Sequence, residues 1–222
     1  MFRFIHYDKP GKGIDPDGPK KRPLFLFLEL YFRKLFSLMQ LNVIYLFCCL
    51  PIFTIGPATA GMTYILREFS EERPVFLWAD FKKNMKKNFK QGFFVWLINV
   101  VLWFLLVLDG LIFYARPSVF SVIMLALLVI IAIVFAMMQL YLYPLMISYQ
   151  YTVLELYKNA FLLAMSRIYW NLAILAVIAL VSWALYSVAF LSLFLLAFFY
   201  FSTIGFISVF YAGRMMKKFL VS

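Results

Sequence analysis

The longest uncharged stretch of this chain constrains its fold more than any other feature. Residues 168–213, 46 in all, contain no Asp, Glu, Lys, Arg or His. As one straight helix they would be about 69 Å long, whereas the hydrocarbon core of a bilayer is about 30 Å thick. We therefore expect this stretch to cross a membrane and turn back.

Three further stretches support the same fold class. Residues 35–66 and 117–154 carry no charged side chain, and residues 93–113 carry only Asp109. Hydrophobic residues make up 65% of the chain and the mean hydropathy is +0.91, which leaves too little polar surface to cover a soluble globule. The sequence predicts an all-α, polytopic helical membrane protein with about five transmembrane helices plus interfacial amphipathic helices.

The chain divides into a short arm and one membrane domain. Residues 1–23 are rich in Pro, Gly and charge, which predicts a flexible basic arm, and residues 24–222 form the membrane domain. We expect spans at about 35–54, 93–113, 119–147, 171–188 and 192–212, with the last turn near 188–192. Amphipathic helices are expected at about 24–34, 75–90 and 152–166, the last opened by a capping box of Thr152 and Glu155.

The distribution of Lys and Arg predicts the orientation. Seven lie between Arg67 and Lys90, two between residues 150 and 171, three after residue 211, and only Arg116 in the other turns. Basic connections stay in the cytoplasm, so we expect these three there. The N-terminal segment has eight Lys and Arg up to Lys34. It would lie outside if residues 35–54 crossed once, and inside if a re-entrant hairpin turned at Gly56 and Pro57; the sequence leaves both open.

A basic amphipathic pattern follows the first apolar stretch. Apolar side chains mark one helical face of residues 73–90: Trp78, Phe81, Met85 and Phe89. Lysines crowd the other face, which predicts a helix lying on anionic lipid headgroups. The alternative is a charged loop that only fixes topology. The candidate lipid-facing residues are Trp78, Lys82, Lys83, Lys86, Lys87 and Lys90.

A Gly- and Pro-containing block interrupts the first apolar stretch. It combines a helix break with small residues, which are features that broken transporter helices use to bind ions and that packed membrane helices use at close contacts. We favour the packing interpretation and keep the ion site as the alternative. The candidate helix-break or packing residues are Thr54, Gly56, Pro57, Thr59 and Gly61.

Few residues could carry chemistry. Asp109 is the only acid within a clear span and is a candidate intramembrane acid, although near a span end it could meet water or pair with Arg116. The only histidine, His6, lies in the arm, and the two cysteines, Cys48 and Cys49, are adjacent within a span. We expect no catalytic residue, no cofactor, no metal and no nucleic-acid partner, and therefore no enzyme.

Several segments resemble a bacterial family. Tyr7–Gly11, the Leu50–Gly61 block, Phe76–Phe81 and Asn88–Gln91 are similar to the YesL family of integral membrane proteins. The resemblance implies a protein of the bacterial cytoplasmic membrane with about five helices, whose family has no established molecular function. Members are often encoded beside carbohydrate ABC transporters and two-component sensors.

The resemblance and the lack of catalytic groups together indicate a non-enzymatic accessory or regulatory membrane protein linked to a carbohydrate ABC uptake system. Its expected partners are the lipid bilayer, anionic lipid headgroups, and ABC permease or sensor-kinase subunits. The alternative is a small transporter or channel that uses the break at Gly56 and Pro57 as its site.

Overall fold

The computed structural model describes residues 22–116, 118–187 and 196–219. These residues are almost entirely helical and contain no strand, which confirms the all-α expectation. The arm at residues 1–21 with His6, and the turn expected near 188–192, lie outside the described residues.

The helices follow the order of the apolar segments. The first half contains α1 (Pro23–Arg33), α2 (Leu35–Cys48), the short 3-10 helix η1 (Ile52–Thr54), α3 (Ile55–Ser70) and α4 (Leu77–Lys87). The second half contains α5 (Phe89–Ala115), α6 (Val119–Ser148), α7 (Val153–Ser166), α8 (Ile168–Ser187), a π-helical turn η2 (Leu196–Tyr200) and α10 (Phe201–Phe219).

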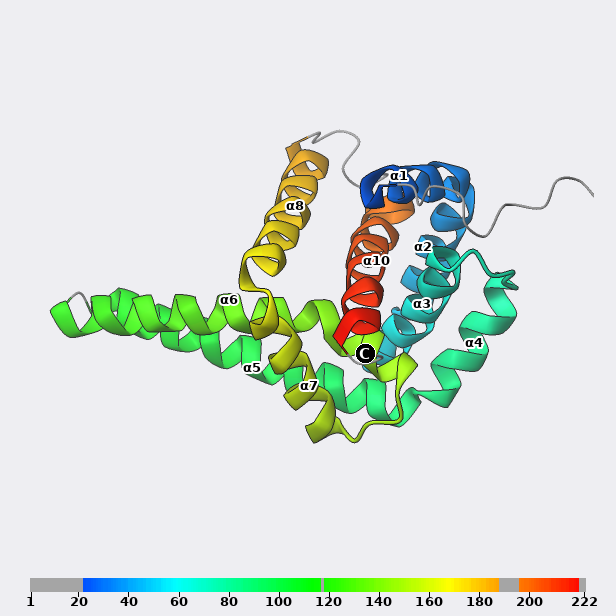
Figure 1. Ribbon diagram of the computed structural model, residues 1–222. Helices are drawn as coiled ribbons and strands as arrows, with labels where there is room; N and C mark the ends of the chain where they lie inside the picture. The colour runs from blue at the N-terminus through cyan, green and yellow to red at the C-terminus, as the bar shows by residue number, and fades with distance from the viewer. Residues whose placement is uncertain (1–21, 117, 188–195, 220–222) are drawn as a thin grey trace, which may run out of the picture.

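One bundle gathers α1, α2, α3 and α10 around an apolar core. Leu30, Leu41 and Leu66 are fully buried there together with Phe206. Phe27 of α1 has its ring centroid 5.3 Å from those of both Phe206 and Phe210. Figure 1 shows these four helices together, so the two ends of the described chain pack side by side.

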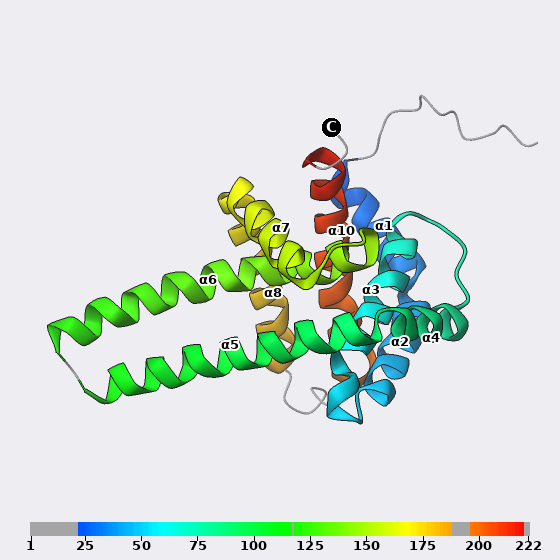
Figure 2. The same cartoon turned by 90° about the horizontal axis from the view of Figure 1, so that it is seen from below.

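Helices α5 and α6 form a long hairpin that projects away from this bundle in both views (Figures 1 and 2). With 27 and 30 residues they are about 40 and 45 Å long. Their mean hydropathies over the most apolar window are 2.3 and 3.2, and only 6% and 11% of those windows are buried. Burying a large apolar side chain is worth about 1.5–3 kcal/mol, so the outer half of the hairpin requires an apolar covering.

Two helices, α5 and α6, are long and apolar enough to cross a membrane within the described residues. The bent pair of α7 and residues 168–184 of α8 would make a third, whereas α2 has only 14 residues. The five predicted spans are thus only partly visible. The predicted span at 35–54 is interrupted after Cys48, and part of the last two falls in residues 188–195, outside the description.

Helices α2 and α3 run antiparallel. Lys34 Nζ, at the start of α2, lies 5.5 Å from the ring centroid of Phe69 near the end of α3. Tyr45 OH, near the end of α2, lies 3.2 Å from Thr59 Oγ1 near the start of α3. The turn between them spans residues 49–54, so the chain reverses there and not at Gly56 and Pro57.

The break predicted at Gly56 and Pro57 is therefore wrong. Both residues lie in the first turn of α3, which begins at Ile55. A proline is tolerated there because the first amides of a helix have no intrahelical acceptor. The chain instead breaks before Pro51, an extended residue with φ −77° and ψ 116°.

Helix α7 begins with the predicted capping box and ends in a sharp bend. Thr152 Oγ1 accepts from the Glu155 amide while the Glu155 carboxylate accepts from the Thr152 amide, which confirms that prediction. The next helix, α8, leaves at 98° to α7. Leu156 and Ala160 on one side of α7 are fully buried and belong to the same apolar core as Leu145 of α6.

Asn171 fixes this bend. Its Nδ2 donates to the carbonyl oxygens of Leu163 (3.2 Å) and Ala164 (2.7 Å), which are end groups of α7. Its Oδ1 accepts from Tyr141 of α6 (2.5 Å) and Tyr211 of α10 (2.7 Å). One buried amide therefore joins four helices.

We expect Asn171→Leu to destabilise the protein by about 2 kcal/mol, because two tyrosine hydroxyls and two carbonyls lose their partner in a buried site. Unfolding in mixed micelles of mild detergent and dodecyl sulfate measures the change. The matched control is Asn159→Leu, since within the described part of the chain Asn159 Nδ2 donates only to the Glu155 carbonyl of its own helix. Equal losses in both variants would contradict the role of Asn171.

Candidate functional site

A charged cluster lies at the end of α3. Glu71 Oε1 lies 3.1 Å from Lys217 Nζ of α10 and 3.9 Å from Arg67 Nε. Its Oε2 lies 2.9 Å from Arg73 Nη2 without hydrogen-bond alignment, so that contact is an ion pair only. The Glu71 side chain is 15% exposed and collects three cations.

The same cluster reaches α1 and α6. Arg33 Nη2 donates to Glu72 Oε2 at 2.6 Å, and Arg67 Nη1 donates to Ser148 Oγ at 3.4 Å. Arg73 also lies 3.5 Å from Glu68. The first helix, the ends of α3 and α6, and the tail of α10 thus meet at one set of charges.

Glu72 sits where glycine is usual. Its φ is 57°, and the amides of Glu72 and Arg73 donate to the carbonyls of Phe69 and Glu68, which is the Schellman pattern that closes a helix. A left-handed non-glycine residue costs about 1 kcal/mol. The ion pair with Arg33 gives a reason for a carboxylate at this position.

The cluster changes the titration of Glu71. Burial alone would raise its pKa, but the hydrogen bond and charge of Lys217, with the charges of Arg67 and Arg73, lower the pKa below its ordinary value. The folded protein therefore favours the ionised form more than the unfolded chain does. This contribution to stability is present above the unfolded pKa and is lost as the pH falls through the folded pKa.

We expect the melting temperature to fall as the pH drops below about 4.5, the ordinary pKa of a glutamic acid, because the unfolded chain then binds a proton at Glu71 before the folded protein does. Lys217→Gln should reduce the free energy of unfolding at neutral pH by about 0.5–1 kcal/mol, a small loss because the lysine is largely exposed. It should also flatten the fall of the melting temperature at low pH. Lys218→Gln is the matched control, as no ion pair joins Lys218 to a described carboxylate. Identical pH profiles for the two variants would contradict the assignment.

Gly56 is a point of backbone contact between α3 and α5. A Cβ built on Gly56 would lie 2.0 Å from the Gly92 carbonyl oxygen, and one on Gly92 would lie 3.0 Å from the Gly56 carbonyl carbon. A Cβ built on Gly61, five residues further along α3, would lie 3.0 Å from the Phe81 carbonyl oxygen and 3.3 Å from the Met85 Cβ. Small residues thus let α4 and α5 approach α3 closely.

The neighbouring threonines form hydrogen bonds within the turn and the start of α3. Thr54 Oγ1 lies 2.5 Å from the carbonyl oxygens of both Cys48 and Pro51, and so closes the turn. Thr59 Oγ1 donates to the Ile55 carbonyl at 2.7 Å and lies near Tyr45. Within the described residues, these five candidate positions therefore make turn and packing contacts.

We expect Gly56→Ala to destabilise the protein by about 3 kcal/mol, because the new methyl group meets backbone that cannot rotate away. Gly110→Ala is the control: its Cβ would meet nothing within 4 Å, and alanine favours a helix by up to about 1 kcal/mol. Thermal unfolding in detergent compares the two. A Gly56→Ala variant as stable as Gly110→Ala would overturn the close contact.

The basic helix α4 docks on α3. Phe81 is fully buried and, with Met85, packs near Gly61. This middle part of the apolar face therefore contacts protein, whereas the sequence predicted that it would lie on lipid. Trp78 remains 52% exposed. The candidate lysines Lys82, Lys83, Lys86, Lys87 and Lys90 are exposed, and no ion pair joins them to a described carboxylate.

The polar residues of the hairpin have separate roles. Asp109 is exposed in the outer part of α5, and no ion pair to Arg116 is found in the described chain. At the inner part, Asn99 and Gln139 exchange two amide hydrogen bonds of 3.0 and 3.2 Å. Tyr157 of α7 donates to Asn99 Oδ1 at 2.8 Å, which ties α7 to the hairpin.

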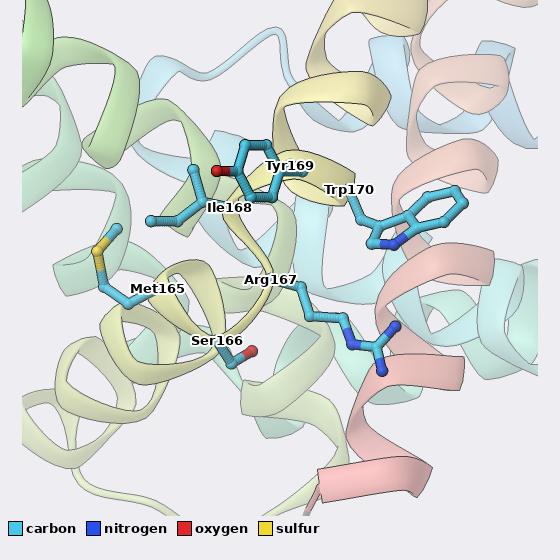
Figure 3. Close-up of a pocket in the computed structure, with 6 residues that line it drawn as sticks. All are labelled: Met165, Ser166, Arg167, Ile168, Tyr169 and Trp170. Carbon is cyan, nitrogen blue, oxygen red and sulfur yellow. The ribbon is translucent and has the colours of Figure 1, made fainter.

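A shallow pocket of about 320 Å³ lies at the α7–α8 bend and is lined by residues 165–170. Figure 3 shows Arg167 and Trp170 directed to one side of the bend and Ile168 to the other. Tyr169 and Trp170 are 88% and 60% exposed, as aromatic residues at a membrane–water boundary are. Among the described residues no group of His, Cys, Asp and Glu could hold a metal ion.

The roles of Asn171, Glu71 and Gly92 were not predicted from the sequence. The partners of Asn171 lie 30 and 40 residues away on other helices. Hydropathy gave no sign of these partners, whereas the single Asn within the 46-residue uncharged run could have marked a buried hydrogen-bond site.

Comparison with known families adds one match. The sequence model of the family described as "Protein of unknown function, DUF624" matches residues 38–110, and the YesL family is known under this description. The matched part covers most of α2 together with α3, α4 and most of α5, including both Gly56 and Gly92. Comparison with curated proteins and with solved structures finds no match.

Proposed function

We propose that this chain is a non-enzymatic accessory or regulatory protein of the bacterial cytoplasmic membrane, linked to a carbohydrate ABC uptake system. The α5–α6 hairpin, with its large exposed apolar surface, supports the membrane part of this proposal. The link to carbohydrate uptake rests on the resemblance to the YesL family alone. The docking role is supported by the exposed apolar face of α7.

The outer face of α7 is the observation that carries the proposal. Its inner face is buried on α6, yet Leu154, Phe161 and Leu162 are 82%, 46% and 55% exposed. The hydrogen bond from Tyr157 to Asn99 holds α7 at the inner part of the hairpin. A fixed apolar helix face with a lysine beside it, Lys158, suits a permease or sensor-kinase subunit as its partner.

The transporter alternative gains no support from the site it was assigned. The Gly92 backbone occupies the space beside Gly56, so this candidate ion site is filled by protein. The hydroxyls of Thr54 and Thr59 donate hydrogen bonds to backbone carbonyls of the same segment. We therefore propose the accessory role alone.

Purification of the tagged full-length protein from its native membranes in mild detergent, with quantitative mass spectrometry, tests the proposal. We expect stoichiometric ABC permease or sensor-kinase subunits with the unaltered chain. The variant Leu154→Ser/Phe161→Ser/Leu162→Ser should lower their recovery about tenfold or more, as expected when apolar anchors are lost.

The control variant Val122→Ala/Ile130→Ala changes exposed apolar residues of the hairpin and should keep the partners. Recovery of a homo-oligomer without either class of subunit would contradict the accessory role. Equal loss in both variants would show a general defect and would contradict the assignment of α7.

A further inference from the structure

We infer that the turn between α2 and α3 and the adjoining end of α4 form one surface that binds anionic lipid. Apolar side chains of the turn enter the acyl-chain boundary, and lysines of α4 contact the phosphates. The inference rests on the membrane part of the proposed function and is independent of the accessory role.

The turn exposes a compact set of large apolar side chains. Phe47, Leu50, Ile52 and Phe53 are 69%, 73%, 67% and 55% exposed. They lie within seven consecutive residues, whereas the residues just beyond the turn, from Gly56 to Ala58, are buried. A protein that left this set in water would carry an aggregation-prone patch.

The backbone of the turn suits an apolar environment. The amides of Cys49, Leu50, Thr54 and Ile55 donate to carbonyls of residues 45–52, and Pro51 has no amide hydrogen. The Thr54 hydroxyl lies 2.5 Å from the carbonyl oxygens of Cys48 and Pro51. Irregular backbone can enter lipid only when its polar groups are satisfied internally, and most of those in this turn are.

Cations stand beside the turn. Gly92 touches Gly56, which places the end of α4 and the start of α5 against the start of α3; Figure 2 shows α2 and α4 side by side there. Lys86, Lys87 and Lys90 occupy this end and are exposed. There is no Asp or Glu in residues 35–67 or 81–108, and Asp80 accepts from the Phe76 amide.

The apolar face of α4 is unavailable for insertion, because Phe81 and Met85 pack on α3. The lysines must therefore remain at headgroup level, and the insertion of the turn is shallow. An acidic protein would also attract these lysines, but the four exposed apolar side chains beside the charges favour a surface that combines hydrocarbon with anionic groups. Charge and apolar surface together fit an anionic bilayer surface.

The test uses the full chain with Cys48→Ala and Cys49→Ala, reconstituted in nanodiscs. A single cysteine at Phe53→Cys carries an environment-sensitive fluorophore, and lipids brominated on their acyl chains quench it on contact. The nanodiscs contain phosphatidylcholine alone or mixed with phosphatidylglycerol. The matched probe at Phe76→Cys reports the far end of α4, where the side chain is 79% exposed.

We expect quenching at position 53 to be about twofold or more stronger with phosphatidylglycerol, and position 76 to stay in water. Lys86→Gln/Lys87→Gln/Lys90→Gln should abolish this dependence, whereas Arg116→Gln/Lys218→Gln, which removes two exposed charges away from the turn, should keep it. The inference is overturned if position 53 stays in water in every lipid, or if the triple variant retains the full response. Release of the chain from membranes by an alkaline wash would instead contradict the proposed function.

Discussion

The backbone contact between Gly56 and Gly92 determines how the two parts of this molecule meet. It brings the start of α3 against the start of α5 and so fixes the direction in which the hairpin leaves the bundle. A side chain on Gly56 would separate the helices, since its Cβ would overlap the Gly92 carbonyl group and the Trp96 Cβ. Asn99, Gln139 and Tyr157 then bind the inner hairpin to α7, and Asn171 binds α7 to α6 and α10.

Polar groups in this chain are concentrated at a few junctions, and each junction joins distant segments. The charges around Glu71 connect α1, α3 and α10, while the amide of Asn171 connects the helices of the second half. The remaining exposed surface is largely apolar or lysine-rich. This division suits a protein whose surroundings include both hydrocarbon and anionic headgroups, because each polar group meets a partner or water.

The sequence predicted elements whose signals are local. Hydropathy located α5 and α6, and the pair Thr152 and Glu155 located the start of α7. It misplaced the break at Gly56 and Pro57, because proline breaks a helix interior but is tolerated in a first turn. It assigned Phe81 to lipid, because an amphipathic pattern reveals an apolar face without revealing what covers it. Contacts such as Gly56 with Gly92 depend on the tertiary fold, which the spacing of residues does not record.

The ion pairs of Glu71 and Glu72 have a consequence for the topology of the whole chain. Arg33, at the end of the first helix, and Lys217, in the last helix, are bound to adjacent residues of the same turn. Both ends of the described chain therefore stand on one side of any bilayer that it crosses. A path that starts and finishes on one side makes an even number of crossings, so two or four satisfy this parity and five do not.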